Sequence, residues 1–134
     1  METPKVVFWA KATESDFDDL PEESAVYVIT VHTTAGTNVV IYTGQTDNIQ
    51  RRSKEHWSKN EPNEKLKNII AKYPSAMALF YAKVHGNSLD GHERFLFNHF
   101  EPQVQEKAPD VEPKELSLTN SFTKGKIKEE HFKK

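Results

Sequence analysis

The sequence predicts an α+β domain, a small three-stranded antiparallel sheet flanked by helices in the order β-β-α-α-β-α. Two observations carry this prediction. Residues 24–32 and 38–44 are rich in β-branched and aromatic side chains and are joined by the turn TTAGTN, which is typical of a β-hairpin. Further along, segments with apolar residues at helical spacing lie on both sides of a third apolar strand, residues 76–85.

The helices follow from the spacing of the apolar residues. The first is expected over 49–60, with Thr46 or Asp47 as its N-cap, and the second over 63–73. The third is expected over 89–100. A proline follows the first and third of these segments, which is where a helix is expected to end.

The chain is expected to hold one domain with two attached ends, because 134 residues is a common domain size. Residues 1–23 are expected to form an N-terminal strand and an acidic loop, and residues 24–106 the main domain. Residues 107–134 lose the periodic pattern and are expected to be an extended basic C-terminal tail, with 103–121 wrapping around the domain.

Composition limits the chemistry. The chain has no cysteine, which excludes disulfides and thiolate metal sites, so any metal must be held by His, Asp or Glu. It also lacks a long apolar run and a signal-peptide pattern at its N-terminus. These absences predict a cytoplasmic protein that does not associate with a membrane.

The charge is distributed unevenly along the chain. The net charge of −2 argues against a protein that coats nucleic acid by bulk electrostatics. However, residues 1–25 hold seven acidic side chains against two lysines, whereas residues 45–72 hold seven basic side chains against four acidic ones. The last eleven residues hold five lysines and two glutamates. This pattern allows either a locally positive face or an ordinary mixed surface.

The first candidate site is in the helix after the hairpin. Arg52 and His56 are four residues apart, so their side chains leave the same helix face, beside the buried stripe. A guanidinium presents a rigid donor fork that suits a phosphate, and a neighbouring imidazole can bond to the same ligand. The alternative is a solvated arginine and a surface histidine.

The second candidate is Glu93 in the helix 89–100, whose neighbours at helical spacing are apolar. An unpaired carboxylate is costly to bury. Glu93 is therefore expected either to form a salt bridge or to face a cleft and hold a cation. Asp90 and Arg94 are expected on the solvent side of the same helix.

Tyr27 and Tyr42, one on each strand of the hairpin, are the third candidate. Such pairs are usually cross-strand packing, but they can also point two phenols into one cleft. A phenol becomes a base only beside a cation, because its ordinary pKa is near 10. Phosphate-binding loops, dinucleotide fingerprints, zinc-protease helices and serine-hydrolase elbows are absent from the sequence.

Taken in order, these residues resemble the GIY-YIG nuclease superfamily, and the chain looks like a single-domain member. Both sequence motifs fall on the hairpin strands, and the remaining positions follow at workable spacing over about residues 24–106. The matching positions are Ala25-Val26-Tyr27, Tyr42-Thr43-Gly44, Arg52, His56, Glu93 and Pro102.

The resemblance implies a metal-dependent endonuclease that hydrolyses DNA phosphodiester bonds with one divalent cation, Mg²⁺ or Mn²⁺. In that case Glu93 holds the metal and Arg52 the scissile phosphate. Tyr27 or Tyr42 takes a proton from the attacking water; we favour Tyr27, with Tyr42 and His56 orienting the water and phosphate. The substrate-binding positions implied are Gly44, Gln45, Arg51 and Gln105.

Three positions depart from the family pattern. Ala25 stands where glycine is usual, Gln45 where lysine is frequent, and Gln105 where the family has asparagine. These departures leave open an alternative function, a catalytically weak or inactive nucleic-acid-binding or regulatory module on the same fold. A third alternative is a protein-interaction domain with a fortuitous motif. With no second DNA-binding domain recognised, specificity is expected from the chain's own surface, its tail, a protein partner or a homodimer.

Overall fold

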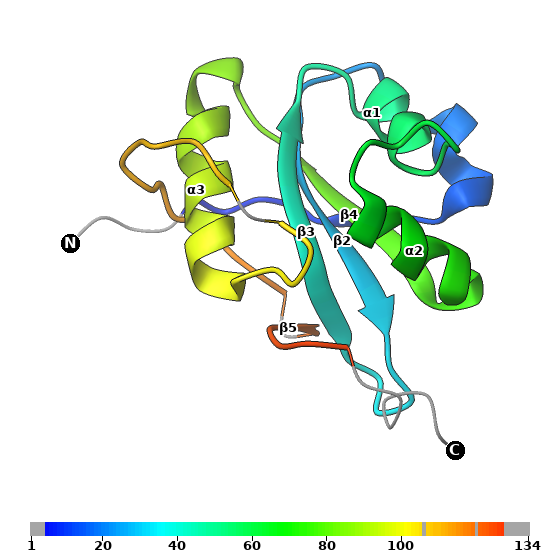
Figure 1. Ribbon diagram of the computed structural model, residues 1–134. Coiled ribbons are helices and arrows are strands. Elements are labelled where there is room, and N and C mark those ends of the chain that lie inside the picture. Colours follow the sequence, from blue (N-terminus) through cyan, green and yellow to red (C-terminus); the bar gives the residue numbers. More distant parts are fainter. Residues whose placement is uncertain (1–4, 106, 120, 128–134) are drawn as a thin grey trace.

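The computed structural model describes residues 5–105, 107–119 and 121–127. Strands and helices alternate along the chain, and three short 3-10 helices (η) join them (Figure 1). In chain order the elements are β1 (Ala10–Ala12), η1 (Glu14–Asp19), β2 (Ala25–His32), β3 (Asn38–Thr46), α1 (Ile49–His56), α2 (Glu64–Lys72), η2 (Pro74–Ala76), β4 (Met77–Lys83), η3 (Gly86–Ser88), α3 (Leu89–Phe100) and β5 (Phe122–Thr123).

The sheet has five strands in the order β1-β4-β2-β3-β5. Its antiparallel centre, β4-β2-β3, consists of the strands expected from sequence, but the prediction of a three-stranded, purely antiparallel sheet was wrong. Strand β1 pairs antiparallel with β4 at one edge, and β5 pairs parallel with β3 at the other. The added strands have three and two residues, which is too short for an alternating pattern to predict them.

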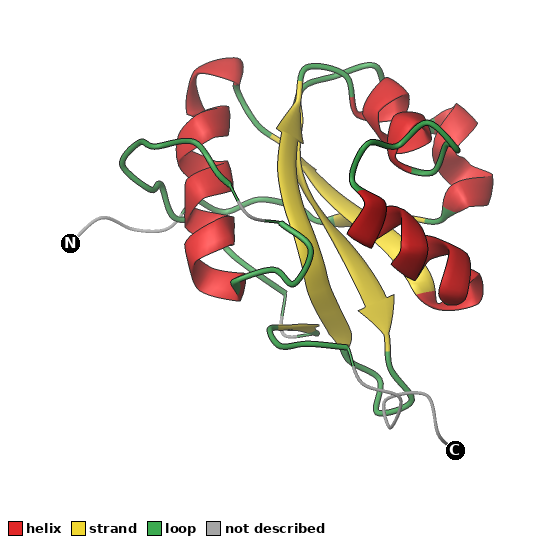
Figure 2. Cartoon of the chain, in the orientation of Figure 1, coloured by secondary structure: helices red, strands yellow, loops and turns green. Residues whose placement is uncertain are grey.

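Helices cover both faces of the sheet. Helix α3 lies on one face, and α1 and α2 lie on the other (Figure 2). Alternate residues of β2 therefore enter different clusters: Val26 and Val28 pack with residues of α3, and Tyr27 and Ile29 with residues of α1 and α2. Burial on both sides explains why the whole strand is apolar. No helix within the described residues is long and apolar enough to cross a membrane.

Helix α1 begins at Ile49, as expected, but its N-cap is neither Thr46 nor Asp47. Asn48 is the N-cap, and its side-chain oxygen accepts a hydrogen bond from the Arg51 amide at 3.0 Å. Thr46 instead uses its hydroxyl within the turn, accepting from the Asn48 amide. The helix also ends at His56, before the expected residue 60. A loop therefore runs from His56 to the start of α2.

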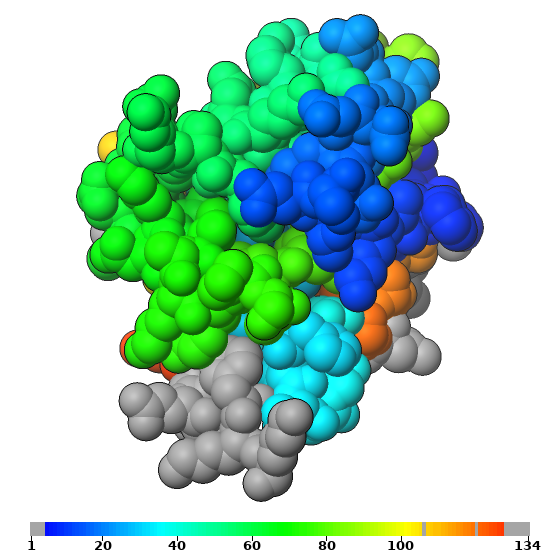
Figure 3. Space-filling model, turned by 90° about the vertical axis from the view of Figure 1, so that its right-hand side faces the viewer, coloured from blue at the N-terminus to red at the C-terminus, as the bar shows by residue number. Residues whose placement is uncertain are grey.

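The outer side of α1 packs against η1, a segment near the N-terminus (Figure 3). The rings of Phe17 and Trp57 meet edge to face with centroids 4.9 Å apart. Lys54 and Asp18 form an ion pair of 2.5 Å across the same contact. This packing holds α1 from outside, so its inner face is fixed against the sheet.

The C-terminal segment is built into the fold rather than trailing from it. The bulk of Phe122 is buried, and its ring packs edge to face on Trp9 with centroids 5.3 Å apart. Phe122, within the segment expected to be an extended basic tail, therefore packs against the domain. The rest of that predicted tail, residues 128–134, lies outside the described residues.

Residues 110–118, here called the strap, cross α3 near its N-terminus. The Lys114 amide donates to the Gly91 carbonyl at 2.9 Å, and the Lys114 carbonyl accepts a hydrogen bond from His92 Nδ1 at 2.8 Å. The strap passes so close that a Cβ at Gly91 would lie 2.7 Å from the Lys114 side chain. The strap therefore restrains the part of α3 that carries Glu93.

Candidate active site

Tyr27 is positioned by its partner on the neighbouring strand. In the β2–β3 register Tyr27 lies opposite Gly44. A Cβ at Gly44 would lie 2.5 Å from the Tyr27 ring, so the phenol passes over the glycine where any side chain would stand. This close approach accounts for the glycine two residues after Tyr42.

The Tyr27 hydroxyl is hydrogen-bonded to the imidazole of His56. Its oxygen lies 2.6 Å from His56 Nε2, and His56 Nδ1 lies 3.1 Å from Glu61 Oε2. All three residues are buried, with exposed fractions of 1% for Tyr27, 1% for His56 and 4% for Glu61. The second carboxylate oxygen of Glu61 accepts from the Asn63 amide at 3.2 Å. The result is a continuous Tyr27–His56–Glu61 chain of hydrogen bonds.

The electrostatics keep this imidazole neutral. Burial, together with the nearby positive charge of Arg52, lowers the pKa of His56 to about 3. Burial also raises the pKa of Glu61, while the Asn63 amide and Arg52 act in the opposite direction. A neutral imidazole has one N–H and one lone pair. The nitrogen that carries the proton therefore decides which of the two neighbours, Glu61 or Tyr27, accepts a hydrogen bond from His56.

Tyr42 joins the same cluster of rings. Its ring stacks with that of Tyr27 at a centroid distance of 6.2 Å, and it meets the His56 ring at 5.0 Å. Unlike Tyr27, Tyr42 is only partly buried. Burial raises the pKa of both phenols, most strongly for Tyr27, and Arg52 opposes that rise in each case.

Arg52 supplies the positive charge of the cluster. Its side chain is 30% exposed and lies 3.6 Å from Glu55. Hydrogen bonding from its guanidinium, as well as its charge, lowers the pKa of both Tyr27 and Tyr42. Burial lowers the pKa of Arg52, but the two tyrosines and Glu61 outweigh this and raise it above its ordinary value. Arg52 therefore stays charged while it faces both phenols.

Glu93 approaches from α3, on the other side of β3. It is half-buried, and burial, with the charge of Asp90, raises its pKa to about 7. Gln45 links β3 to α3, since its side-chain amide bonds to Asp90 and also hydrogen-bonds to Glu93. The charge of Glu93 in turn raises the pKa of both phenols. The predicted catalytic residues thus lie around one stretch of β3.

The oxygen-rich surroundings of Glu93 fit a hard divalent cation. Carboxylate and amide oxygens are the ligands that Mg²⁺ and Mn²⁺ prefer. Among the described residues Glu93 forms no ion pair, and a cation there would stabilise a carboxylate that burial and Asp90 destabilise. A group of three or more His, Asp or Glu is not found in the described part of the chain, so Glu93 would share such an ion with substrate and water.

Three of the expected substrate-binding residues have intramolecular partners: Gln45, as described above, Gln105 and Arg51. The Gln105 side-chain oxygen accepts from the Thr43 amide at 2.8 Å and from the Thr43 hydroxyl at 2.6 Å. Gln105 thereby attaches the chain after α3 to the edge of β3. Arg51 is exposed on the outer side of α1 and forms an ion pair of 2.6 Å with Asp47.

Sequence reasoning missed two members of the site. Glu61 was not singled out because it lies in the loop after α1, where no helical spacing relates it to His56. Its one signal is position, a carboxylate five residues after the histidine and directly before a proline. Asp90 was expected on the solvent side; it is exposed, yet its carboxylate also contacts Gln45 and acts on Glu93.

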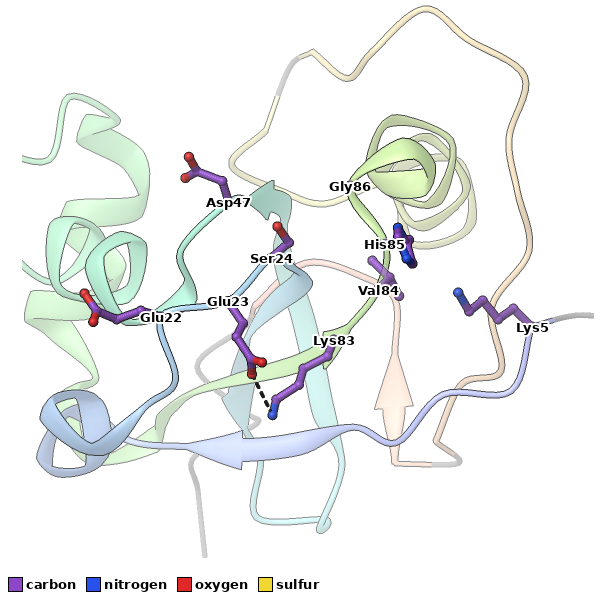
Figure 4. Close-up of a pocket in the computed structure, with 9 residues that line it drawn as sticks. All are labelled: Lys5, Glu22, Glu23, Ser24, Asp47, Lys83, Val84, His85 and Gly86. Atoms are coloured by element: carbon purple, nitrogen blue, oxygen red, sulfur yellow. Dashed lines mark ion pairs between the residues drawn. The ribbon is translucent and has the colours of Figure 1, made fainter.

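Two open pockets lie near these residues, and their charges differ. A pocket of about 640 Å³ at the end of the sheet contains Glu22 and Asp47, and the Glu23–Lys83 ion pair of 2.7 Å (Figure 4). Its carboxylates disfavour a phosphate. A second pocket, of about 500 Å³, is lined by Tyr42 and the N-terminus of α2, and its charged residues are one carboxylate, Glu64, and two lysines, Lys65 and Lys107. The second pocket reaches the ring cluster and suits a polyanion better.

Comparison with known proteins agrees with this geometry at the level of family. Residues 23–108 match the family model of the GIY-YIG catalytic domain. Searches of curated proteins and of solved structures find no significant match. The matched segment contains both tyrosines, Arg52, His56 and Glu93.

Proposed function

This chain belongs to the GIY-YIG catalytic domain family, a family of nuclease type, and we propose that it is an endonuclease that hydrolyses DNA phosphodiester bonds with one Mg²⁺ or Mn²⁺ ion. The observation that carries this proposal is the Tyr27 hydroxyl, 2.6 Å from an imidazole nitrogen that can take its proton. Arg52, beside the same hydroxyl, provides the positive charge that a phosphate and a phenolate both need.

Tyr27 acts as the proton acceptor for the attacking water. As a water proton passes to the Tyr27 oxygen, the Tyr27 proton passes to His56 Nε2. Burial and the charge of Arg52 oppose this transfer in the free protein, and the negative charge of the bound phosphate offsets that of Arg52. The hydroxide oxygen then bonds to phosphorus, and the ester P–O bond breaks with its electron pair on the leaving oxygen, which takes a proton from solvent. Both ring nitrogens of His56 have protein partners, Tyr27 and Glu61, so His56 serves Tyr27 and does not touch DNA.

Arg52 and Glu93 act on the phosphate. Arg52 donates to the phosphate oxygens and stabilises the charge that grows on them during attack. Glu93 holds the cation, and Gln45 and Asp90 fix the direction of its carboxylate. A bound divalent cation supplies Lewis-acid polarisation of the phosphate and stabilisation of the leaving oxygen.

The DNA strand is proposed to lie along the pocket that Tyr42 shares with the N-terminus of α2. Tyr42 is half-exposed there and adjoins the buried Tyr27, so water and phosphate approach the reacting hydroxyl past Tyr42. Lys65 and Lys107 line the same pocket and favour the backbone of the strand. Arg51, exposed on the outer side of α1 and paired with Asp47, is proposed to contact the DNA backbone outside this pocket.

Plasmid nicking and branched-DNA cleavage with Mg²⁺ or Mn²⁺ test the proposal. Arg52→Ala and Glu93→Gln are expected to reduce cleavage by at least about 10²-fold, the size of an electrostatic contribution of this kind. Lys54→Ala, on the same helix but paired with Asp18, is the matched control and should cleave like the natural chain. Metal-dependent cleavage that survives in both site variants would refute these assignments.

A second candidate function is DNA binding with little cleavage. Two observations favour it: Tyr27 is 1% exposed, and Gln45, at a position where the family often has lysine, bonds to Asp90. If salt-sensitive DNA binding occurs and no DNA form tested is cleaved with either metal, this function replaces the first. Each phosphate contact then contributes about 0.9 to the slope of log affinity against log salt.

A further inference from the structure

We propose that Glu61 is a positioning residue for the cleavage proposed above: it accepts the Nδ1 proton of His56 and so directs the free Nε2 lone pair at Tyr27. The inference rests on the proposed function for its chemical role, but its structural content stands on the hydrogen bonds alone. Glu61 lies in the loop between α1 and α2, outside every motif that identified the site.

The direction of each hydrogen bond follows from fixed donors. The Asn63 backbone N–H can only donate, and it donates to Glu61 Oε1 at 3.2 Å. The other oxygen, Oε2, faces His56 Nδ1 at 3.1 Å. An ionised carboxylate accepts only, so Nδ1 must carry the imidazole proton. His56 Nε2 then has only a lone pair, and the Tyr27 hydroxyl 2.6 Å away must donate to it.

The charge of Glu61 has a local partner. Its side chain is 2% exposed, and an isolated carboxylate at that depth would be costly. The positive charge of Arg52 acts on Glu61 and on Tyr27 alike. Arg52 and Glu61 therefore balance each other across the neutral Tyr27–His56 pair. When His56 takes the Tyr27 proton, Glu61 stabilises the resulting imidazolium.

The isosteric substitution Glu61→Gln is expected to reverse the direction of the two hydrogen bonds of His56 without removing them. In Glu61→Gln the single amide oxygen must serve the Asn63 N–H, because that backbone donor cannot be reversed. The amide NH₂ then faces His56 Nδ1 and donates to it. The imidazole must move its proton to Nε2, which leaves the Tyr27 hydroxyl facing an N–H instead of a lone pair.

The first experiment reads the imidazole directly. Long-range ¹H–¹⁵N NMR spectra of the ¹⁵N-labelled chain at pH about 7.5 should show His56 protonated at Nδ1 in the natural protein and at Nε2 in Glu61→Gln. Glu64→Gln, which removes an exposed charge three residues away, is the matched control and should keep the natural pattern. A natural protein protonated at Nε2, or an unchanged pattern in Glu61→Gln, overturns the proposal.

The second experiment measures single-turnover cleavage at saturating DNA. Glu61→Gln should cleave about 10²-fold more slowly, at the lower end of what general acid–base catalysis contributes, with unchanged DNA affinity. Because Glu61 acts through Tyr27, the same substitution in a Tyr27→Phe background should cost no further activity. Equal losses in both backgrounds would mean a structural role and would overturn the proposal.

The endonuclease proposal and the positioning role of Glu61 can be refuted independently of each other. If the natural chain cleaves no DNA, the endonuclease proposal fails, while the NMR result still decides the placement of the His56 proton. If the natural chain cleaves and Glu61→Gln cleaves equally well with a reversed imidazole, the positioning role alone fails. Should Glu61→Gln not fold, Glu61→Asp, which keeps an accept-only carboxylate, should retain the natural imidazole pattern, and a reversed pattern there overturns the proposal.

Discussion

The ring of Tyr27 lies directly over Gly44, so closely that a Cβ at Gly44 would be 2.5 Å from two atoms of the phenol. The two residues face each other across the β2–β3 pair, in the central part of the sheet. The space that the glycine leaves is filled by the phenol that meets His56. Sheet geometry and the position of the proposed base are thus set by the same contact.

Gly44→Ala is expected to displace Tyr27 and to destabilise the protein by about 1–3 kcal/mol, the range for forcing an extra methyl into a packed site. Urea unfolding and single-turnover cleavage should both reveal the loss. Gly86→Ala is the matched control, since nothing lies within 4 Å of its added Cβ. Gly44→Ala with natural stability and cleavage would show that the phenol can move aside freely.

The two tyrosines are expected to differ on removal of their hydroxyl groups. Tyr27→Phe removes the proton donor to buried His56 and should slow cleavage by about 10²-fold or more. Leaving His56 Nε2 unsatisfied should also destabilise the fold by about 1–3 kcal/mol. Tyr42→Phe should slow cleavage by less than about tenfold. A larger loss of cleavage in Tyr42→Phe would make Tyr42 the proton acceptor.

The contribution of His56 to stability should fall as the pH is lowered, whereas Glu93, whose pKa is raised to about 7, acts in the opposite direction. The pKa of His56 is about 3 in the folded protein and about 6.5 when unfolded, so between these values the unfolded chain binds the extra proton. The His56 contribution is complete above pH about 6.5 and is lost as the pH falls, by up to about 1.4 kcal/mol per pH unit.

Urea unfolding of the natural chain and of His56→Gln at several pH values between about 7 and 4 checks this slope. The raised pKa of Glu61 acts in the opposite direction, since its folded form takes up a proton first, and His92 acts in the same direction as His56. The comparison must therefore be between the slopes of the two proteins. Identical slopes would mean that buried His56 does not have a lowered pKa.

Neighbouring arginines on α1 should separate binding from chemistry. Arg51 is exposed and paired with Asp47, so Arg51→Ala should weaken DNA binding and reduce the salt slope by about 0.9. At saturating DNA its cleavage rate should stay within about threefold of the natural rate. Lys54→Ala should leave the slope unchanged. A cleavage rate in Arg51→Ala as low as in Arg52→Ala would place Arg51 beside the phosphate.

The sequence predicted the strands and helices in which apolar residues recur at a regular spacing. The long strands β2, β3 and β4 and the helices alternate or repeat over enough residues to be recognised, and the family resemblance is confirmed. Strand β5 was missed because two residues carry no pattern and its partner lies about 80 residues away in the chain. Glu61 was missed for a related reason, because only the turn between two helices brings it to His56.

The His56 environment was also beyond sequence reasoning. Spacing placed His56 and Arg52 on the same side of a helix, which is correct, but it could not distinguish an exposed imidazole from a buried one. Burial depends on the Tyr27 ring, the Tyr42 ring and the loop that carries Glu61 all packing around the same imidazole. Such convergence is a property of the folded chain.

The strap over α3 makes synthesis order matter for this molecule. The strap and Phe122 leave the ribosome after α3, yet they lie against this helix, which carries Glu93. The hairpin with its tyrosines, and α1 with Arg52, emerge far earlier. During translation the hairpin and α1, which carry the tyrosines and Arg52, can therefore fold first. The contacts that restrain Glu93 on α3 form only after the strap has been synthesised. A nascent chain released before the strap is synthesised would contain the tyrosines and Arg52 in their folded positions but would lack the contacts that restrain Glu93.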